Sequence, residues 1–322
     1  MPRSEPLRLA VLVRDHEPDV GELDGVDVRL ATKDDLIDAV TDADALLVWD
    51  FSAVGVAAAL PAARRLRWIH ISSAGVDRVL DDEIRRRDII VTNSRGVLDE
   101  TMAEYVLGLM LALVKDLRGT FERQARHEWE HRPTYRLAGR RALIVGVGGI
   151  GRATAAMLHA VGVAVDGVGR TGREDDPPFG TVYDHAALHE LVGAYDFVVV
   201  AAPLTSQTRG MVDASVLATM RPSAYLVNVG RGELVDEQAL TTVLRSGGLA
   251  GAALDVFSTE PLPAGHELWT LPGVIVSPHM GGDYVGWRDD LWAVFVANLT
   301  RFCSGEPLQN VVDKDLGYVP SR

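Results

Sequence analysis

Residues 142–151 read Ala-Leu-Ile-Val-Gly-Val-Gly-Gly-Ile-Gly, and an alanine-rich helical pattern follows them. This order predicts a buried strand, a tight turn and a helix. In that setting Gly146 permits the sharp turn, Gly148 lets a pyrophosphate approach the backbone, and Gly151 lets the helix pack closely on the strand. The first amides of the helix would face the phosphates, with the helix dipole behind them. We interpret the stretch as a dinucleotide-binding turn; the alternative is a glycine-rich turn that serves packing alone.

Composition narrows the class of protein. The chain has 322 residues, of which 47% are hydrophobic, and its formal net charge is −13. The length favours two domains, and the acidic balance argues against nucleic-acid binding. The longest apolar windows, such as residues 105–114, are about half as long as a bilayer span, so we expect no membrane segment. The N-terminus has no signal-peptide pattern and Cys303 is the single cysteine, which together predict a cytoplasmic protein without internal disulfides.

Short β-rich runs alternate with helical patterns along most of the chain, as in parallel sheets flanked by helices. The predicted strands are 7–13, 26–31, 45–48, 66–71 and 89–92 in a first set, and 142–145, 164–168, 197–200, 224–229, 251–254 and 274–276 in a second. A long helical pattern at 101–128 separates the sets, a last helix is expected near 283–302, and residues 172–180 are expected to be flexible. We predict an α/β protein with two doubly wound parallel-sheet domains and ligands at the carboxyl ends of the strands.

The end of the second strand of the later set decides between NAD and NADP. An NAD site usually places an acidic side chain there, about 20 residues beyond the glycine motif, to bind the ribose hydroxyls. Here the strand runs into Gly-Arg-Thr-Gly-Arg at 169–173, and Asp166 comes too early in the strand to reach the ribose. The guanidiniums of Arg170 and Arg173 and the hydroxyl of Thr171 suit a 2′-phosphate. We predict NADP(H) as the preferred cofactor; the alternative is a solvated basic turn that accepts NAD(H) as well.

Three polar residues that follow predicted strands have the chemistry needed for hydride transfer. Arg231 comes after the strand at 224–229, Glu260 precedes a proline-bounded turn, and His279 follows the strand at 274–276. Reduction of a ketone requires a proton carrier at the carbonyl oxygen, a group that tunes this carrier, and a cation that holds a carboxylate or polarises the carbonyl. From the residues alone, a surface or capping role for each stays the alternative.

Six motifs along the chain form a set. They are Ser-Ala-Gly-Val-Asp at 73–77, the glycine motif, Ala-Pro-Leu-Thr at 202–205, Asn-Val-Gly-Arg-Gly at 228–232, Ala-Leu-Asp-Val-Phe at 253–257 with Glu-Pro-Leu-Pro at 260–263, and Ser-Pro-His-Met-Gly-Gly at 277–282. In this order they resemble the D-isomer-specific 2-hydroxyacid dehydrogenases over nearly the whole chain. The resemblance implies a flavodoxin-like substrate domain of residues 1–97 and 287–322, with a Rossmann NAD(P)-binding domain of residues 98–286 inserted.

The resemblance also implies roles for individual residues. His279 would exchange a proton with the substrate oxygen, Glu260 would fix its tautomer and favour the imidazolium, and Arg231 would hold the substrate carboxylate or carbonyl. The predicted substrate-binding residues are Ser73, Ala74, Gly75, Val76, Arg231 and His279. The predicted cofactor-binding residues are Gly146, Gly148, Gly149, Ile150, Gly151, Arg170, Thr171, Arg173, Ala202, Pro203, Thr208, Val229 and Asp255, the last at the nicotinamide amide.

The activity that the resemblance implies is interconversion of a 2-ketoacid and a D-2-hydroxyacid, with glyoxylate, hydroxypyruvate or a bulkier 2-ketoacid as substrate. The Arg170 site is similar to that of NADP-preferring glyoxylate and hydroxypyruvate reductases. The alternative from another class is an NAD(H)-sensing corepressor, because C-terminal binding proteins keep this fold and can retain the Arg–Glu–His set; the missing strand-end acid argues against it. Formate dehydrogenases carry a glutamine at the position of Glu260, which disfavours that activity, and phosphite oxidation is a minor alternative.

A second motif, His-Glu-Trp-Glu-His at 127–131, matches the zincin string His-Glu-x-x-His. On a helix the two histidines would share one face. Arg132-Pro133 follows at once and predicts the end of the helix, and no third ligand lies at a useful spacing. We predict no metal site.

Two further expectations concern surfaces. The pattern at 104–114 is apolar almost all round, so it forms either ordinary core or an interface. Family members commonly dimerise through this region, so we predict a homodimer. Trp49, Asp50, Tyr284 and Trp287 are expected to shape the substrate pocket and to leave room for a bulky or aromatic side chain.

Overall fold

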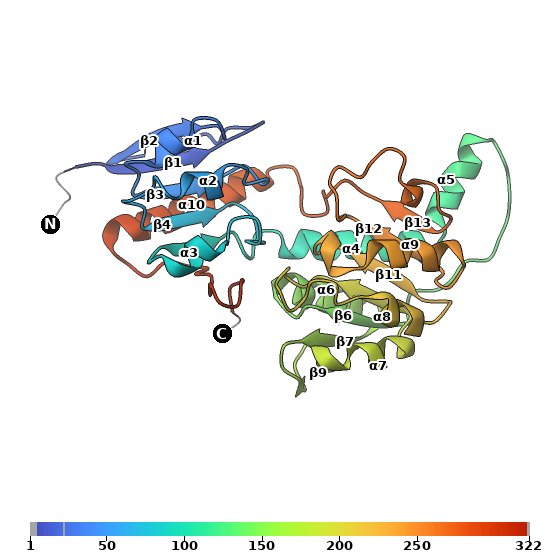
Figure 1. Ribbon diagram of the computed structural model, residues 1–322. Coiled ribbons are helices and arrows are strands. Elements are labelled where there is room, and N and C mark those ends of the chain that lie inside the picture. The colour runs from blue at the N-terminus through green and yellow to red at the C-terminus, as the bar shows by residue number, and fades with distance from the viewer. Residues whose placement is uncertain (1–4, 22, 321–322) are drawn as a thin grey trace. The chain divides into compact units, whose positions relative to one another are not determined.

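The chain forms two α/β units, each built on its own sheet (Figure 1). The computed structural model describes residues 5–21 and 23–320. Unit 1 comprises the residues up to Val97 together with those from Val285 onward, and unit 2 comprises Leu98–Tyr284. The last helix therefore belongs to the same unit as the N-terminal strands.

Unit 1 is a sheet of five parallel strands in the order β2-β1-β3-β4-β5. The strands are β1 (Leu7–Leu12), β2 (Val26–Ala31), β3 (Ala45–Val48), β4 (Trp68–Ile71) and β5 (Ile90–Asn93). The helices are α1 (Leu36–Val40), α2 (Val56–Ala59), α3 (Asp82–Arg86) and α10 (Trp287–Ser304). Side chains of α1, α2 and α3 pack into the core on one face of the sheet, and those of α10 pack into the core on the other. The unit is doubly wound, with the flavodoxin-type strand order.

Unit 2 contains an eight-stranded sheet in the order β13-β12-β11-β10-β6-β7-β9-β8. Its strands are β6 (Arg141–Val145), β7 (Ala164–Gly169), β8 (Arg173–Glu174), β9 (Thr181–Asp184), β10 (Phe197–Val200), β11 (Tyr225–Asn228), β12 (Gly251–Leu254) and β13 (Val274–Val276). Its α-helices are α4 (Asp99–Val114), α5 (Leu117–Ala125), α6 (Gly149–Ala160), α7 (Leu188–Leu191), α8 (Ala214–Thr219) and α9 (Glu237–Arg245). Short 3-10 helices are η1 (His185–Ala187), η2 (Val192–Ala194), η3 (Gly232–Leu234) and η4 (Glu267–Trp269).

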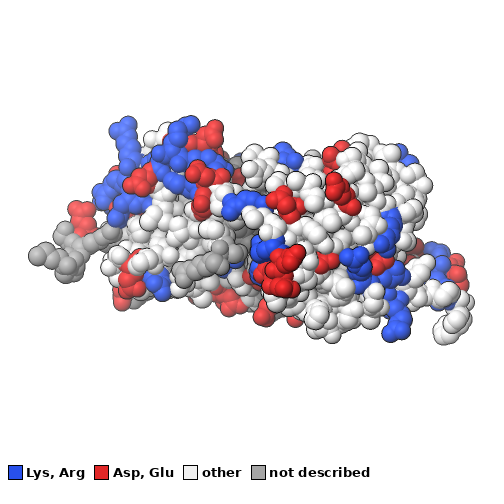
Figure 2. All heavy atoms as spheres, turned by 90° about the horizontal axis from the view of Figure 1, so that it is seen from below, with Lys and Arg blue, Asp and Glu red and all other residues white. Residues whose placement is uncertain are grey.

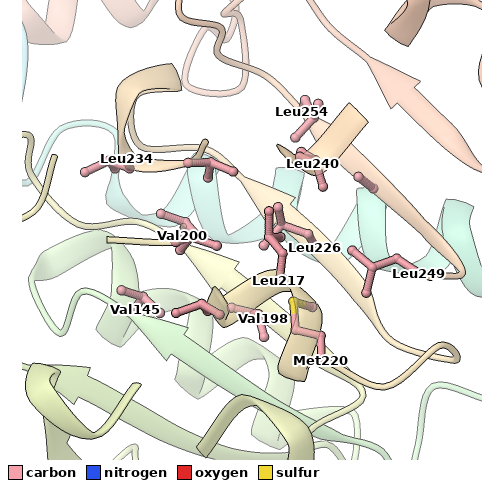
Figure 3. Packing of buried hydrophobic residues seen from close by; sticks show 14 of the residues in the cluster. Val145, Val198, Val200, Leu217, Met220, Leu226, Leu234, Leu240, Leu249 and Leu254 are labelled. Carbon is pink, nitrogen blue, oxygen red and sulfur yellow. The ribbon is translucent and has the colours of Figure 1, made fainter. Parts of the chain in front are cut away.

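Helices cover both faces of this second sheet. On one face, side chains of α7, α8 and α9 join a core that includes Val198, Leu226 and Leu254 (Figure 3). On the other, α4 and α6 pack against Ile144 and Val199. Strands such as β10 are apolar and buried at every position, which is typical of parallel strands covered on both faces. The predicted fold class, two doubly wound parallel-sheet domains, is confirmed.

The structure corrects the sequence prediction in two places. Residues 172–180 do not form a plain flexible segment, because β8 lies there and pairs antiparallel with β9, a strand that the sequence analysis missed. The single helix expected at 101–128 is two helices, because Asp116 adopts a left-handed φ of +46° and its side chain caps α5 by accepting from the Gly119 amide at 3.1 Å. Aspartate tolerates this conformation better than most residues, and its short carboxylate suits an N-cap.

Helix α4 is mainly core. Its residues Met102, Val106, Met110, Leu113 and Val114 are buried in the same cluster as β6 and β10. The larger exposed apolar side chains of this region lie instead on α5 and the segment after it, at Phe121, Trp129 and Tyr135.

The charged side chains form a mixed surface on the one face that is drawn. Acidic and basic side chains are intermingled on the face that Figure 2 shows. Among the described residues, no helix combines the length and apolar character needed to cross a membrane.

Candidate active site

The strand register of unit 2 aligns the carboxyl ends of six strands at one edge of the sheet. The residues paired in succession along this edge are Val168, Val145, Val200, Asn228, Leu254 and Val276. Every residue of unit 2 that we predicted to bind cofactor or to act in catalysis follows one of these ends. The strand order reverses between β6 and β10, which is where dinucleotides bind in doubly wound sheets.

The glycine turn after β6 has the geometry that dinucleotide binding requires. Gly146 has a φ of +110°, and a Cβ there would lie 2.6 Å from the Ala202 nitrogen. A Cβ on Gly151 would lie 1.9 Å from the Gly146 carbonyl oxygen, so α6 packs on the turn itself. At Gly148 no atom lies within 4 Å of the corresponding position, and no side chain caps α6. The first amides of α6 are therefore open to an anionic group, which fits a pyrophosphate.

The remaining glycine of the motif has a packing role. A Cβ on Gly149 would lie 2.0 Å from a carboxylate oxygen of Asp99 on α4, so a larger residue there would displace the Asp99 side chain. Ile150 packs against the core on the α4 side of the sheet.

The basic segment after β7 is exposed. One of its two arginines is free of hydrogen bonds and ion pairs among the described residues, and the other is bonded to a nearby carboxylate. Arg170 makes no hydrogen bond or ion pair with any described residue. Arg173, in contrast, donates from Nε to the Asp176 carboxylate at 2.6 Å and lies near the Thr171 carbonyl. Asp166, for which the sequence suggested no role, accepts from the Thr181 amide at 3.0 Å and from the Tyr195 hydroxyl at 2.7 Å. It is a structural residue within the sheet.

The segment after β10 forms a compact turn beside the glycine turn. Thr208 donates from its hydroxyl to the Pro203 carbonyl at 2.6 Å and accepts from the Thr205 amide at 2.8 Å. Ala202 and Val229 are buried at the ends of β10 and β11. Of the predicted cofactor-path residues, Thr208 thus holds the turn, while Ala202 and Val229 contribute backbone and packing.

The loop after β11, which bears Arg231, and the loop after β12, which bears Glu260, approach each other closely. A Cβ on Gly232 would lie 1.9 Å from the Phe257 carbonyl carbon, so the loop after β11 rests directly on the backbone after β12. The Phe257 amide donates to Glu260 Oε1 at 3.1 Å. The Arg231 carbonyl accepts from the Asn228 side chain at 3.0 Å, which fixes the start of η3. The loop that bears the arginine is thus packed against the loop that bears the glutamate.

Glu260 and His279 form a directly bonded pair. Nδ1 of His279 lies 2.9 Å from Glu260 Oε2, and their side chains are 41% and 23% exposed. Among the described residues, Nε2 of His279 makes no hydrogen bond. A carboxylate on Nδ1 favours the tautomer in which Nδ1 carries the proton, and leaves Nε2 for exchange with a substrate oxygen.

The segment that carries His279 is anchored by Asp255. His279 has a left-handed φ of +53°, which is costly for a residue other than glycine. Asp255 is 1% exposed, and its oxygens accept from the Ser277 hydroxyl at 2.7 Å, the Met280 amide at 3.0 Å and the Gly281 amide at 2.9 Å. The sequence analysis missed this anchor, because no local pattern links residue 255 to the segment 277–281. The predicted contact of Asp255 with nicotinamide stays a prediction.

Burial raises the pKa of Tyr105 on α4; the Asp255 carboxylate adds to this rise, and Ser277 opposes it. A Cβ on Gly281 would lie 2.6 Å from the Tyr105 ring. The partly buried phenol ring of Tyr105 therefore packs against the segment that carries His279.

In unit 1, residues 73–76 form a loop with its amides free. The carbonyls of Ser73, Ala74 and Gly75 accept from the Ser94 amide at 3.1 Å, the Asn93 side chain at 2.6 Å and the Ser73 hydroxyl at 2.7 Å. The Val76 carbonyl accepts from two later amides. Within residues 5–21 and 23–320, the four amides of the loop donate no hydrogen bond. Successive free amides whose carbonyls are all hydrogen-bonded suit a carboxylate.

The pocket residues expected from the sequence are only partly accessible. Trp49 is a core residue that packs edge-on against Trp292 in the cluster under α10, so its predicted place in a pocket is wrong. Ala45, Leu47 and Trp49 share one strand face, a period-two signal that was present in the sequence. Asp50 binds Ser52 of its own turn. Trp287 is accessible in part and packs against the exposed Phe51 at 5.2 Å, a neighbour that the sequence analysis did not name.

The zincin string does not have a helical arrangement. Helix α5 ends at Ala125, and His127 has a left-handed φ of +56°. The two histidines therefore do not lie one turn apart on a helix face, and the described residues contain no cluster of three or more metal-ligating side chains.

A doubly wound sheet with a glycine turn at its switch point, together with a histidine–glutamate pair at the same edge, defines the class of nicotinamide-dependent dehydrogenases. Comparison with known proteins narrows this class. Residues 107–281 match the family model described as "D-isomer specific 2-hydroxyacid dehydrogenase, NAD binding domain". The chain belongs to the D-isomer-specific 2-hydroxyacid dehydrogenase family, and is an oxidoreductase that uses NAD(P).

Individual relatives agree with this assignment. A glyoxylate reductase of Thermococcus kodakarensis is 32% identical over 87% of this chain and 86% of its own length. A glyoxylate/hydroxypyruvate reductase B of Pectobacterium carotovorum is 36% identical over 78% of this chain and 80% of its own. The NADPH-dependent glyoxylate/hydroxypyruvate reductase of Sinorhizobium meliloti, solved with NADP and sulfate, has a TM-score of 0.83 at 28% identity and covers 96% of this chain and 99% of its own. These relatives favour an enzyme that acts on 2-ketoacids over an NAD(H)-sensing corepressor.

Proposed function

We propose that the protein is a 2-ketoacid reductase that prefers NADPH and uses His279 as its proton donor. The observation that carries the proposal is the 2.9 Å pair between His279 Nδ1 and Glu260, which leaves Nε2 for the substrate. Bound NADPH would supply the hydride for the carbonyl carbon. The matching proton would pass from His279 Nε2 to the carbonyl oxygen, so that ketone, hydride and proton balance as an alcohol.

The other residues hold and orient the reactants. Glu260 keeps the imidazole in one tautomer and in one orientation, because it is itself held by the Phe257 amide. The planar guanidinium of Arg231 suits a bidentate contact with a carboxylate or an approach to the carbonyl oxygen. The free amides of residues 73–76 suit the substrate carboxylate. The proposed substrates are glyoxylate, hydroxypyruvate or a bulkier 2-ketoacid.

The preference for NADPH is proposed from the segment after β7. Its strand end carries Gly169 and the exposed Arg170, so it lacks the carboxylate that binds the ribose in NAD sites and would repel a 2′-phosphate. The Sinorhizobium meliloti enzyme is described as NADPH-dependent, and a family member from Xanthobacter autotrophicus was solved with NADPH. The same residues also allow NAD(H) to bind.

A panel of 2-ketoacids assayed with NADPH and NADH tests the activity. We expect turnover of at least one 2-ketoacid and a lower KM for NADPH. His279→Ala should lose most turnover while NADPH still binds, measured by protein fluorescence. Near-normal kcat in that variant, or no turnover of any 2-ketoacid by the unchanged protein, would contradict the proposal.

We also propose that the protein is a homodimer and that it works in the cytoplasm. The exposed Phe121, Trp129 and Tyr135 on α5 and the segment after it support an interface there, since aromatic side chains are enriched at protein interfaces. Light scattering measures the mass directly, and a monomeric mass at micromolar concentration would remove the dimer.

A further inference from the structure

One acidic side chain joins the basic segment that the proposed function assigns to the 2′-phosphate. Asp176 Oδ2 lies 2.6 Å from Nε of Arg173 and 2.7 Å from a terminal nitrogen of Arg152. Asp176 is the most enclosed of the three, with its side chain 19% exposed. The hairpin of β8 and β9 brings it there, seven residues beyond the end of β7.

The two arginines differ in how firmly they are held. Arg152 in the first turn of α6 also donates to the Pro177 carbonyl at 3.1 Å, and its guanidinium lies over the Phe179 ring. Arg173 is more exposed, and its further contact, with the Thr171 carbonyl, is long at 3.4 Å. Arg152 therefore serves the structure of the hairpin, whereas Arg173 is free to exchange its carboxylate partner for another anion.

We propose that Asp176 is a specificity-determining residue that competes with the 2′-phosphate for Arg173 and so lowers the preference for NADPH over NADH. The inference rests on the proposed function, because it assigns the segment after β7 to the adenosine ribose. Asp176 occupies the Nε edge of Arg173, so a 2′-phosphate cannot take this bidentate edge of the guanidinium while the pair is intact. In addition, the fixed negative charge of Asp176 repels an approaching dianion.

NADH lacks the 2′-phosphate with which Asp176 competes. Its 2′-hydroxyl is uncharged, and it needs neither guanidinium. Arg170, which has no partner among the described residues, remains open to the phosphate in either case. Asp176 therefore acts on the ratio of the two affinities and has little effect on the binding of the shared part of the cofactors. The two arginines in turn lower the pKa of Asp176, Arg152 most, so the carboxyl is ionised at neutral pH.

Asp176→Asn tests this inference, with Asp175→Asn as the matched control. Both changes remove one negative charge from the same turn, and Asp175 has a φ of +50°, which asparagine adopts readily. Asp175 makes no hydrogen bond or ion pair with a described residue. Dissociation constants for NADPH and NADH are measured by fluorescence titration of the whole protein, together with those for adenosine 2′,5′-bisphosphate and AMP.

Asp176→Asn should lower the dissociation constants of NADPH and adenosine 2′,5′-bisphosphate by roughly three- to tenfold, because charged contacts range from weak when exposed to stronger when well formed. The dissociation constants of NADH and AMP should change less than about twofold. Asp175→Asn should leave the ratio unchanged within about twofold. Weaker NADPH binding in Asp176→Asn, an equal effect on both cofactors, or the same gain in Asp175→Asn would overturn the inference.

A second variant identifies the arginine. If the competition acts through Arg173, Asp176→Asn should gain clearly less for NADPH when Arg173→Ala is already present, because only the direct charge repulsion is then removed; a full gain in that background overturns the proposal. The same measurements distinguish failure of this inference from failure of the proposed function. A protein that binds neither dinucleotide removes the proposed function and this inference together. A protein that reduces a 2-ketoacid, but whose cofactor ratio ignores Asp176, removes this inference alone.

Discussion

Asp255→Asn should show whether the His279 segment depends on one buried carboxylate. Asp255 accepts three hydrogen bonds from residues 277–281 and is almost fully enclosed. Asparagine offers one acceptor oxygen and one NH₂ group, so whichever way it turns, the NH₂ faces a backbone N–H of Met280 or Gly281. At least one buried donor loses its acceptor, which costs about 1.5–3 kcal/mol, and the remaining bonds weaken from charged to neutral strength.

The worked loss is about 2–4 kcal/mol, and much of it should appear locally. His279 is held at a φ of +53°, so the segment relaxes when its anchor weakens. If re-forming the productive geometry costs about 2 kcal/mol, kcat should fall roughly 30-fold. Ser277→Ala is the control, because it removes only the hydroxyl donor and keeps both backbone donors on Asp255; we expect a loss of about 1 kcal/mol and kcat within about fivefold.

The assay combines denaturant unfolding, steady-state kcat and the dissociation constant of NADPH. If Asp255 anchors the His279 segment, Asp255→Asn should lower the free energy of unfolding and kcat, with little change in the dissociation constant of NADPH. A variant with normal stability and kcat, whose NADPH binding alone is weak, would refute it and assign Asp255 to the nicotinamide instead.

Three further predictions concern backbone supports and a buried histidine. Asn93→Ala removes the donor to the Ala74 carbonyl and should raise KM for a 2-ketoacid about fivefold without changing NADPH affinity. Steady-state kinetics measures this, and an unchanged KM would contradict binding of the substrate carboxylate by residues 73–76. Gly148→Ala should keep normal stability yet bind dinucleotide roughly tenfold more weakly, whereas Gly151→Ala should lose about 2–4 kcal/mol of stability, since only its Cβ meets a carbonyl; thermal melts and titrations should separate the two, and equal behaviour would contradict the turn geometry. Burial lowers the pKa of His70 from 6.5 to about 3, so the unfolded chain takes up a proton first as pH falls, and the stability present above pH 6.5 is lost toward pH 3. Between pH 7 and pH 5 this costs about 2 kcal/mol, and His70→Gln should remove that part of the pH dependence of denaturant unfolding; an identical pH dependence in the variant would contradict it.

The parts of the site that sequence could predict are those that follow strand ends. The glycine turn, Arg231 and His279 come within three residues of a strand end, and Glu260 lies in the loop after β12; parallel strands bring their carboxyl ends to one edge. The predicted convergence of Glu260 and His279 therefore needed only the sheet type and the strand order.

The parts that sequence could not predict depend on contacts between distant segments. Nothing near Asp255 indicates that its carboxylate will bind the amides of Met280 and Gly281, because this depends on the register of β12 against β13. The pairing of Asp176 with Arg152 was hidden for the same reason, since it depends on a two-residue strand, β8, that is too short for a periodic pattern. The buried position of Trp49, in contrast, could have been predicted, because strand alternation places it on the same buried face as Ala45 and Leu47.

The two proposed binding elements rest on backbone supports that belong to different units, which gives them separable kinetic signatures. Asn93 holds the carbonyl side of the 73–76 loop inside unit 1, and that loop would contact only the substrate carboxylate, present in ketone and transition state alike. Loss of such uniform binding raises KM and leaves kcat nearly unchanged. Asp255 holds the segment of His279 inside unit 2, and proton donation develops only in the transition state, so its loss lowers kcat. If both variants changed the same constant, the carboxylate and the proton would not be handled by these separate elements.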